Sequence, residues 1–149
     1  MTDDTPRSTI DGVIVRSLRV ISDARGAVLH MLRSDAPGFA GFGEAYFSEI
    51  LPGVTKAWKR HRRTTQQLAV PAGRVRFMLM DGREDSPTHG ARMDVELGRP
   101  DAYRLLVIPP MVWYGWTCLG ETPALVANCI SEPFDAGESE QTDALPILK

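Results

Sequence analysis

The chain of 149 residues lacks any run of about 18 apolar residues, and no stretch of it has a convincing helical period. We therefore expect no membrane-spanning helix and no membrane partner. Cysteine is scarce, with only Cys118 and Cys129, and neither has the CxxC spacing of a redox or metal site. We expect both to be buried thiols in a reducing compartment. A net charge of −2 at pH 7 argues against a nucleic-acid partner, because such binders carry a net basic footprint.

The two ends of the chain are polar. Residues 1–6 are acidic and polar, whereas a secretory signal peptide is basic and then apolar, so we expect a cytoplasmic protein. Residues 1–9 and about 136–149 are predicted to be loosely docked tails. The total length suits one domain, and we predict a single domain over residues 1–149.

Short apolar segments alternate with turn residues through the rest of the chain, which is typical of an antiparallel β protein. Closing such strands into a barrel or a two-sheet jelly roll satisfies the strand edges and leaves a mouth for a ligand. We therefore predict an all-β jelly-roll barrel. The expected strands cover residues 13–21, 27–32, 44–50, 56–63, 67–70, 75–80, 93–97, 103–108, 112–118 and 124–130.

The stretch 56–63 is the most distinctive, because six of its eight residues are Lys, Arg or His. Such local positive charge in an acidic chain predicts a small anion held at one place. The metal motif of cupin barrels would have histidines at positions 59 and 61 and a glutamate three or four residues later. The chain has Lys59 and His61 in the two histidine places, and Thr, Thr or Gln where the glutamate should be. An ammonium group repels a divalent cation, so we predict that this site binds no metal.

Four short motifs follow one another along the chain: DARG at 23–26, GVTKAWK at 53–59, DGREDSPTHG at 81–90 and IPPMVWYGW at 108–116. They are similar, in this order, to D-x-R-G, G-V-x-R-G-x-H, D-x-R-x-x-S-P-T-x-G and I-P-P-G-x-x-H-G-F of the dTDP-4-dehydrorhamnose 3,5-epimerase family. The resemblance extends from residue 23 to about 134. It implies a cupin-like jelly-roll β-barrel, a homodimer and an activity without a cofactor.

The resemblance also implies a reaction. It is acid/base proton transfer next to the ketone of a dTDP-linked or related 4-keto-6-deoxysugar, in surface polysaccharide or deoxysugar biosynthesis. In that family a His is the base and a Tyr the acid, and the corresponding positions here hold Lys59 and Asn128. An Asp from a longer C-terminal part, to which the resemblance does not extend, assists the family's base. The family's other ligand-binding residues correspond to Arg25, which is unchanged, Lys56 for an Arg, Gln67 for a Lys and Tyr114 for a second His.

The substituted residues still suggest proton-transfer chemistry. Lys59 lies beside Trp58 and several cations, and burial and like charge would disfavour its ammonium form, so it could act as a general base or form a Schiff base. Tyr114 could then donate a proton from a neighbouring strand, and His61 is either a structural hydrogen-bonder or a second base. We predict Lys59, Tyr114 and His61 as catalytic residues. Lys56 and Lys59 lie three positions apart, so both face inward only if a β-bulge intervenes.

The remaining candidates would contact the substrate. Tyr46 and Trp58 offer flat rings for a base or a sugar, and Ser48 lies on the same side of its strand as Tyr46. The resemblance implies a ligand contact at His30, where the family has a ligand-facing Glu. The predicted substrate-binding set is Arg25, His30, Tyr46, Ser48, Lys56, Trp58, Gln67 and Asn128.

Two other functions compete with the epimerase interpretation. A catalytically silent cupin would hold a sugar nucleotide or a small anion between Arg25, Lys56 and Lys59 without any reaction. A 3,4-ketoisomerase-like enzyme would share the barrel and the substrate class, but the usual pair of histidines on one strand is absent.

Overall fold

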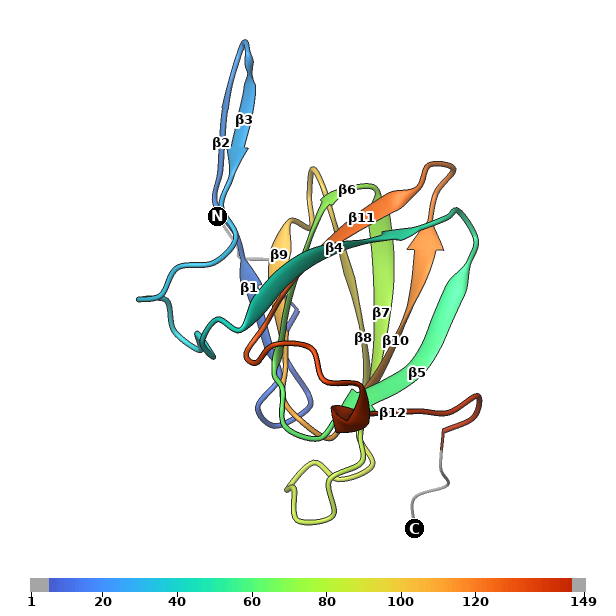
Figure 1. Ribbon diagram of the computed structural model, residues 1–149. Coiled ribbons are helices and arrows are strands. Elements are labelled where there is room, and N and C mark those ends of the chain that lie inside the picture. Colours follow the sequence, from blue (N-terminus) through green and yellow to red (C-terminus); the bar gives the residue numbers. More distant parts are fainter. Residues whose placement is uncertain (1–5, 146–149) are drawn as a thin grey trace.

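The computed structural model describes residues 6–145, which form two five-stranded antiparallel sheets and a separate two-stranded hairpin (Figure 1). The strand order is β1-β9-β6-β11-β4 in the first sheet and β12-β5-β10-β7-β8 in the second. This architecture confirms the predicted all-β class. It also matches the predicted two-layer arrangement, in which the inner faces of both sheets share one core.

The strands of the first sheet are β1 (Ile14–Ser17), β9 (Arg104–Ile108), β6 (Gln66–Ala72), β11 (Ala124–Ile130) and β4 (Glu44–Ile50). Those of the second are β12 (Ser139–Gln141), β5 (Thr55–His61), β10 (Val112–Leu119), β7 (Arg74–Asp81) and β8 (Arg92–Gly98). The hairpin consists of β2 (Val20–Asp23) and β3 (Gly26–Leu29), and a short 3-10 helix, η1 (Ala136–Glu138), precedes β12.

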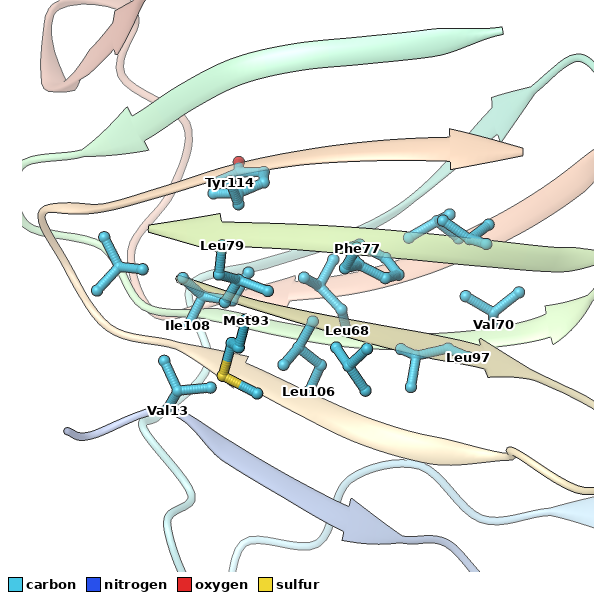
Figure 2. Packing of buried hydrophobic residues seen from close by; sticks show 14 of the residues in the cluster. Val13, Leu68, Val70, Phe77, Leu79, Met93, Leu97, Leu106, Ile108 and Tyr114 are labelled. Carbon is cyan, nitrogen blue, oxygen red and sulfur yellow. The ribbon is translucent and has the colours of Figure 1, made fainter. Parts of the chain in front are cut away.

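The apolar core lies between the two sheets (Figure 2). Leu68, Phe77 and Leu106 have no exposed surface, and each side chain buried in this way contributes roughly 1.5–3 kcal/mol. Strands β7 and β8 alternate between buried and more exposed residues, as expected for a sheet with one covered face. Tyr114 lies at the margin of this cluster, and its phenol oxygen points away from the aliphatic side chains (Figure 2).

Asp81, at the end of β7, organises the loop that leads to β8. Its fully buried carboxylate accepts hydrogen bonds from Arg83 Nε at 2.8 Å, Ser86 Oγ at 2.5 Å and Thr88 Oγ1 at 2.7 Å. Burial alone would raise the pKa of Asp81, but these donors outweigh it and hold the pKa well below 3.8. The DGREDSPTHG motif is therefore a carboxylate-centred turn that joins two strands.

The hairpin β2–β3 stands away from both sheets (Figure 1). Residues 13–21, expected as one strand, divide into β1 and β2 because the chain leaves the first sheet after Ser17. Three apolar side chains of the hairpin are exposed: Val20 at 36%, Ile21 at 45% and Val28 at 60%.

The C-terminal segment differs from its prediction. Residues 136–141, expected as part of a tail, form η1 and then β12, which pairs with β5 through Ser139 opposite His61 and Gln141 opposite Lys59. Glu138 of η1 is only 3% exposed. Of the two predicted tails, residues 1–5 and 146–149 lie outside the described residues.

Both cysteines are buried and unpaired, as predicted. Between residues 6 and 145, no helix has the length and apolar character needed to cross a membrane.

We expect Asp81→Asn to lower the free energy of unfolding by roughly 2–4 kcal/mol, because the amide loses the charge and turns two hydrogens toward groups that are themselves donors. Urea unfolding followed by tryptophan fluorescence measures the loss. Since the pKa of Asp81 is lowered on folding, its contribution is complete above pH 3.8 and declines as the pH falls below that value.

The matched control is Asp94→Asn, on the exposed face of β8, with an expected change within about 0.5 kcal/mol. Equal urea midpoints for Asp81→Asn and the wild type at neutral pH would contradict the assigned role of Asp81.

Candidate active site

A cavity of about 760 Å³ opens between the two sheets. Strands β4 and β11 of the first sheet line one side, and β5 and β10 of the second sheet line the other. Residues 133–135 and the C-terminal segment that carries η1 and β12 complete its wall. Of the predicted catalytic and substrate-binding residues, eight line this cavity: Tyr46, Ser48, Lys56, Trp58, Lys59, His61, Tyr114 and Asn128.

Glu138, His61 and Tyr114 form a hydrogen-bonded row in the wall of the cavity. Glu138 Oε1 lies 2.6 Å from His61 Nδ1, and His61 Nε2 lies 2.9 Å from Tyr114 Oη. The rings of His61 and Tyr114 are nearly parallel, with an interplanar angle of 10°. All three residues are buried, at 3%, 8% and 8% exposure.

The Glu138 carboxylate is ionised at neutral pH. Burial alone would raise its pKa, but hydrogen bonds from the backbone N–H groups of Arg63 and Thr64 and from His61 lower the pKa to about 2. The Thr64 hydroxyl adds a further hydrogen bond at 3.1 Å. A buried carboxylate with this many donors is an orienting group for the imidazole rather than an acid.

The ionised Glu138 also determines the tautomer of His61. A carboxylate can only accept, so Nδ1 of His61 carries the hydrogen and Nε2 of the neutral ring accepts from the Tyr114 hydroxyl. Burial lowers the pKa of His61 below 6.5, and this outweighs the opposing influence of Glu138. Burial raises the pKa of Tyr114 far above its usual value of 10. At neutral pH the row therefore consists of a phenol, a neutral imidazole that can accept a proton, and a carboxylate.

A row of neutral polar side chains lies along the opposite wall, which also includes the carboxylate of Glu44. Asn128 Nδ2 donates to Tyr46 Oη at 3.2 Å and to Gln66 Oε1 at 2.7 Å. Gln66 Nε2 donates to Thr64 Oγ1 at 3.1 Å, which connects this row to Glu138. Strands β4 and β11 pair antiparallel with Tyr46 directly opposite Asn128.

A β-bulge in β5 brings both predicted lysines into the cavity. Tyr114 pairs with Lys59 and Trp116 pairs with Lys56, so two steps along β10 correspond to three along β5. The bulge approaches β10 closely, because a Cβ atom at Gly115 would lie only 2.6 Å from Ala57 Cβ. Lys56 and Lys59 therefore line the same cavity despite their odd spacing.

The three arginines of the basic stretch form ion pairs with acidic side chains and do not line the cavity. Arg60 and Arg62 pair with Glu140 at 2.6 and 2.5 Å, and Arg63 pairs with Glu132 at 3.1 Å. These ion pairs connect β5 to the segments that follow β11. Of the basic side chains in this stretch, the two lysines and the neutral His61 line the cavity wall.

Three predicted substrate contacts lie outside the cavity of their own chain. Arg25, at the turn of the β2–β3 hairpin, has a 91% exposed side chain that pairs with Asp23. His30 follows β3 and lines a separate cavity of about 330 Å³ with Arg16 and Arg19. Gln67 is fully buried, where it donates to the backbone oxygens of Gly41 and Cys129 and so holds the loop before β4.

The sequence did not point to Glu138 or Thr64 as site residues. Glu138 lies in the predicted tail, and its contact with His61 spans 77 positions along the chain. The one local signal is Asp135, which caps η1 by accepting from Gly137 N and could have marked a helical turn there. The described residues contain no group of three or more His, Cys, Asp and Glu side chains arranged to hold a metal ion.

Comparison with known proteins places the chain among sugar-modifying enzymes. No protein-family model matches it. It is 39% identical over 132 residues to the spore coat polysaccharide biosynthesis protein SpsL of Bacillus subtilis, covering 89% of this chain and 87% of that protein. It is 32% identical over 134 residues to the probable low-salt glycan biosynthesis epimerase Agl13 of Haloferax volcanii, with 89% and 85% covered.

Solved structures agree. The crystal structure of a dTDP sugar isomerase from Desulfovibrio desulfuricans is 56% identical and superimposes with a TM-score of 0.87, covering 89% of this chain and 85% of that one. Structures of dTDP-4-dehydrorhamnose 3,5-epimerases share the fold at identities of 16% to 22%. These matches confirm the predicted cupin-like barrel of the sugar epimerase type.

We expect the side chain of His61 to titrate below pH 6.5, and its pKa to fall further in Glu138→Gln, because the carboxylate raises that pKa through its hydrogen bond and its charge. Two-dimensional NMR of the imidazole protons across pH 4 to 8 measures both values, since the chain has only three histidines.

Glu132→Gln serves as the control, because that carboxylate is exposed and pairs with Arg63 rather than with the histidine. An unchanged His61 pKa in Glu138→Gln would show that the carboxylate does not act on the ring.

Proposed function

We propose a function from one premise: the chain belongs to the dTDP-4-dehydrorhamnose 3,5-epimerase family. The protein is a nucleotide-sugar epimerase or isomerase that moves protons next to the ketone of a dTDP-linked or related 4-keto-6-deoxysugar. Its pathway is the biosynthesis of a surface polysaccharide or another deoxysugar product. The names of the two curated relatives, one in spore coat polysaccharide and one in glycan biosynthesis, support this assignment.

The observation that carries the proposal is the Glu138–His61–Tyr114 row in the wall of the cavity. A carbon next to a ketone loses its proton to a base when the resulting enolate is stabilised. A free phenolate at Tyr114 would be costly, because burial raises the pKa of this residue. Tyr114 therefore accepts the sugar proton while its own proton moves to His61 Nε2, and Glu138 stabilises the imidazolium that forms.

Lys59 and Lys56 supply positive charge to the same cavity. Lys59 pairs directly with Tyr114 across β5 and β10, so its ammonium lies on the same wall as the proposed base. An ammonium beside the ketone oxygen stabilises the enolate, and one beside the diphosphate holds the nucleotide. We assign Lys59 to the enolate and Lys56 to the diphosphate. Trp58 and Ser48, on the same walls, contact the nucleoside or the sugar.

The predicted role of Lys59 as the base itself stays a prediction, and so does the catalytically silent binder. The two lysines would serve a binder equally well, but a binder has no use for a buried carboxylate that orients a histidine onto a phenol. The 56% identical protein is called a dTDP sugar isomerase, so a shift of the ketone between C3 and C4 is a second reaction to test.

We expect the wild-type protein to exchange a sugar proton at C3 or C5 for deuterium when it is incubated with dTDP-4-keto-6-deoxyglucose in D2O. Tyr114→Phe and Lys59→Ala should slow this exchange by at least about 10²-fold, because each removes a group that acts in the proton transfer. One-dimensional proton NMR follows the sugar signals for exchange and the thymine line widths for binding. Product identification separates epimerisation from a ketone shift.

Broadened thymine lines without any exchange in the wild type would favour the silent binder. Unchanged sugar and thymine signals would remove dTDP sugars as substrates. Exchange that survives in Tyr114→Phe but not in Lys59→Ala would move the base from the histidine row to the lysine.

We further propose that the protein is a cytoplasmic homodimer in which the β2–β3 hairpins contact the second copy. The hairpin exposes Val20, Ile21 and Val28, apolar side chains that a monomer would leave in water. Arg25, at its turn, lies away from the cavity of its own chain. If Arg25 contacts substrate, as the family resemblance implies, it reaches the cavity of the other copy.

Light scattering coupled to gel filtration should give twice the mass of one chain for the wild type. Val28→Asp should lower it toward that of a monomer, because a carboxylate buried in an apolar contact is unfavourable. Leu51→Asp is the control, as Leu51 is also exposed, at 55%, but lies after β4. A Val28→Asp variant that keeps the wild-type mass would exclude the hairpin from the contact.

A further inference from the structure

Tyr46 lies in the cavity wall that faces the proposed base but has no role in the mechanism described so far. It belongs to β4, whose residues alternate between half-buried and exposed, and the exposed neighbour Phe47 shows that Tyr46 faces inward. Tyr114 belongs to β10 of the other sheet and lines the same cavity. Two phenols thus enter one cavity from opposite sheets.

The hydroxyl group of Tyr46 is oriented by Asn128. The backbone N–H of Gln67 donates to Asn128 Oδ1 at 3.2 Å, which turns the amide nitrogen of Asn128 toward Tyr46 and Gln66. The Tyr46 oxygen therefore accepts a hydrogen bond. Across the described residues 6–145, Tyr46 has no hydrogen-bond acceptor for its own proton. The proton of Tyr46 is therefore available to a ligand in the cavity.

The surroundings of Tyr46 suit a proton donor. Burial raises the pKa of Tyr46, which keeps the phenol protonated at neutral pH, and the hydrogen bond from Asn128 acts in the opposite direction by stabilising the phenolate. The residue is only half buried, so water from the open cavity can restore its proton. The charge on Tyr46 also influences the pKa of Tyr114, consistent with two phenols that share one cavity.

We propose that Tyr46 is the catalytic acid that returns a proton to the sugar carbon from the face opposite the Tyr114–His61 row. Inversion of a carbon centre requires removal of a proton from one face and delivery to the other, and opposite walls of one cavity meet that requirement. The proposal rests on the proposed function, since it needs an enolate formed by the base.

The step balances without any further reactant. The C–H bond next to the ketone breaks and its electron pair forms the C=C bond of the enolate. The sugar proton passes to the Tyr114 oxygen, while the hydroxyl proton of Tyr114 moves to His61 Nε2. The enolate then collapses to the ketone. The C=C pair forms a new C–H bond with the Tyr46 proton, and the phenolate that remains accepts the hydrogen bond from Asn128. Water returns a proton to Tyr46 and removes one from His61, so no net oxidation or reduction occurs.

The test compares Tyr46→Phe with Tyr103→Phe, the same chemical change at the remaining tyrosine, which is buried outside the cavity. The substrate is dTDP-4-keto-6-deoxyglucose in D2O, and NMR follows exchange and inversion separately. We expect Tyr46→Phe to keep deuterium exchange with retained configuration but to lose inversion by at least about 10²-fold. Tyr103→Phe should match the wild type in both.

A second measurement separates an acid from a structural residue. Replacing Tyr46 with 3-fluorotyrosine, whose phenol is the stronger acid, should move the alkaline limb of the pH profile for inversion to lower pH. A residue that only packs against the substrate would leave that limb unchanged, because its protonation would not enter the rate.

The outcomes are distinct. Wild-type inversion rates in Tyr46→Phe would overturn the role of Tyr46 and leave the proposed function intact. Loss of exchange and of thymine broadening together in Tyr46→Phe would mean that the residue is needed for binding, and this also overturns its role as the acid. A wild type that neither exchanges nor converts the sugar would overturn the proposed function and the Tyr46 assignment with it.

Discussion

Burial of an ionised carboxylate at Glu138 is the constraint on which the site depends. A buried charge is tolerated only when donors surround it, and the donors here come from the end of β5 and the turn that follows it. The same contact therefore holds the C-terminal segment against the barrel and orients His61. The position of η1 and β12 and the protonation state of His61 cannot vary independently, because one carboxylate determines both.

The two walls of the cavity differ in the charged and polar groups that they present to a ligand. The wall of β5 and β10 carries the lysines and the histidine, so it presents positive charge and a proton acceptor. On the wall of β4 and β11, neutral amides orient the phenol of Tyr46, and the carboxylate of Glu44 lines the same wall. A sugar bound between them would have the developing enolate charge near one wall, while the other wall orients a neutral proton donor. This asymmetry is what a two-face proton transfer needs, because two positively charged walls would compete for the same enolate.

Local patterns predicted most of the strands, because turn residues punctuate apolar segments whose alternation reflects one covered face. The motifs shared with cupin barrels and with the epimerase family, rather than this alternation, predicted that residues 59, 61 and 114 gather at one cavity. Local patterns did not predict the features that depend on contacts between residues far apart in the sequence. Glu138 is a single acidic residue in a polar stretch, and only its meeting with His61 gives it a role. Arg25 and the hairpin show the same limit, because nothing in the local sequence says that the chain leaves the sheet after β1.

Pairing between β4 and β11 explains how a catalytic acid on β4 could occupy nearly the same part of the cavity as one on β11. The family's acid corresponds to position 128, where this chain has an asparagine, and Tyr46 lies directly opposite that position. Residues opposite each other in an antiparallel pair have Cβ atoms roughly 5 Å apart, a separation that a tyrosine side chain can span. A phenol on β4 can therefore reach much of the space that one on β11 would occupy. The asparagine left behind need not be inert, since its amide now donates to the phenol oxygen and stabilises the phenolate that a proton donor leaves.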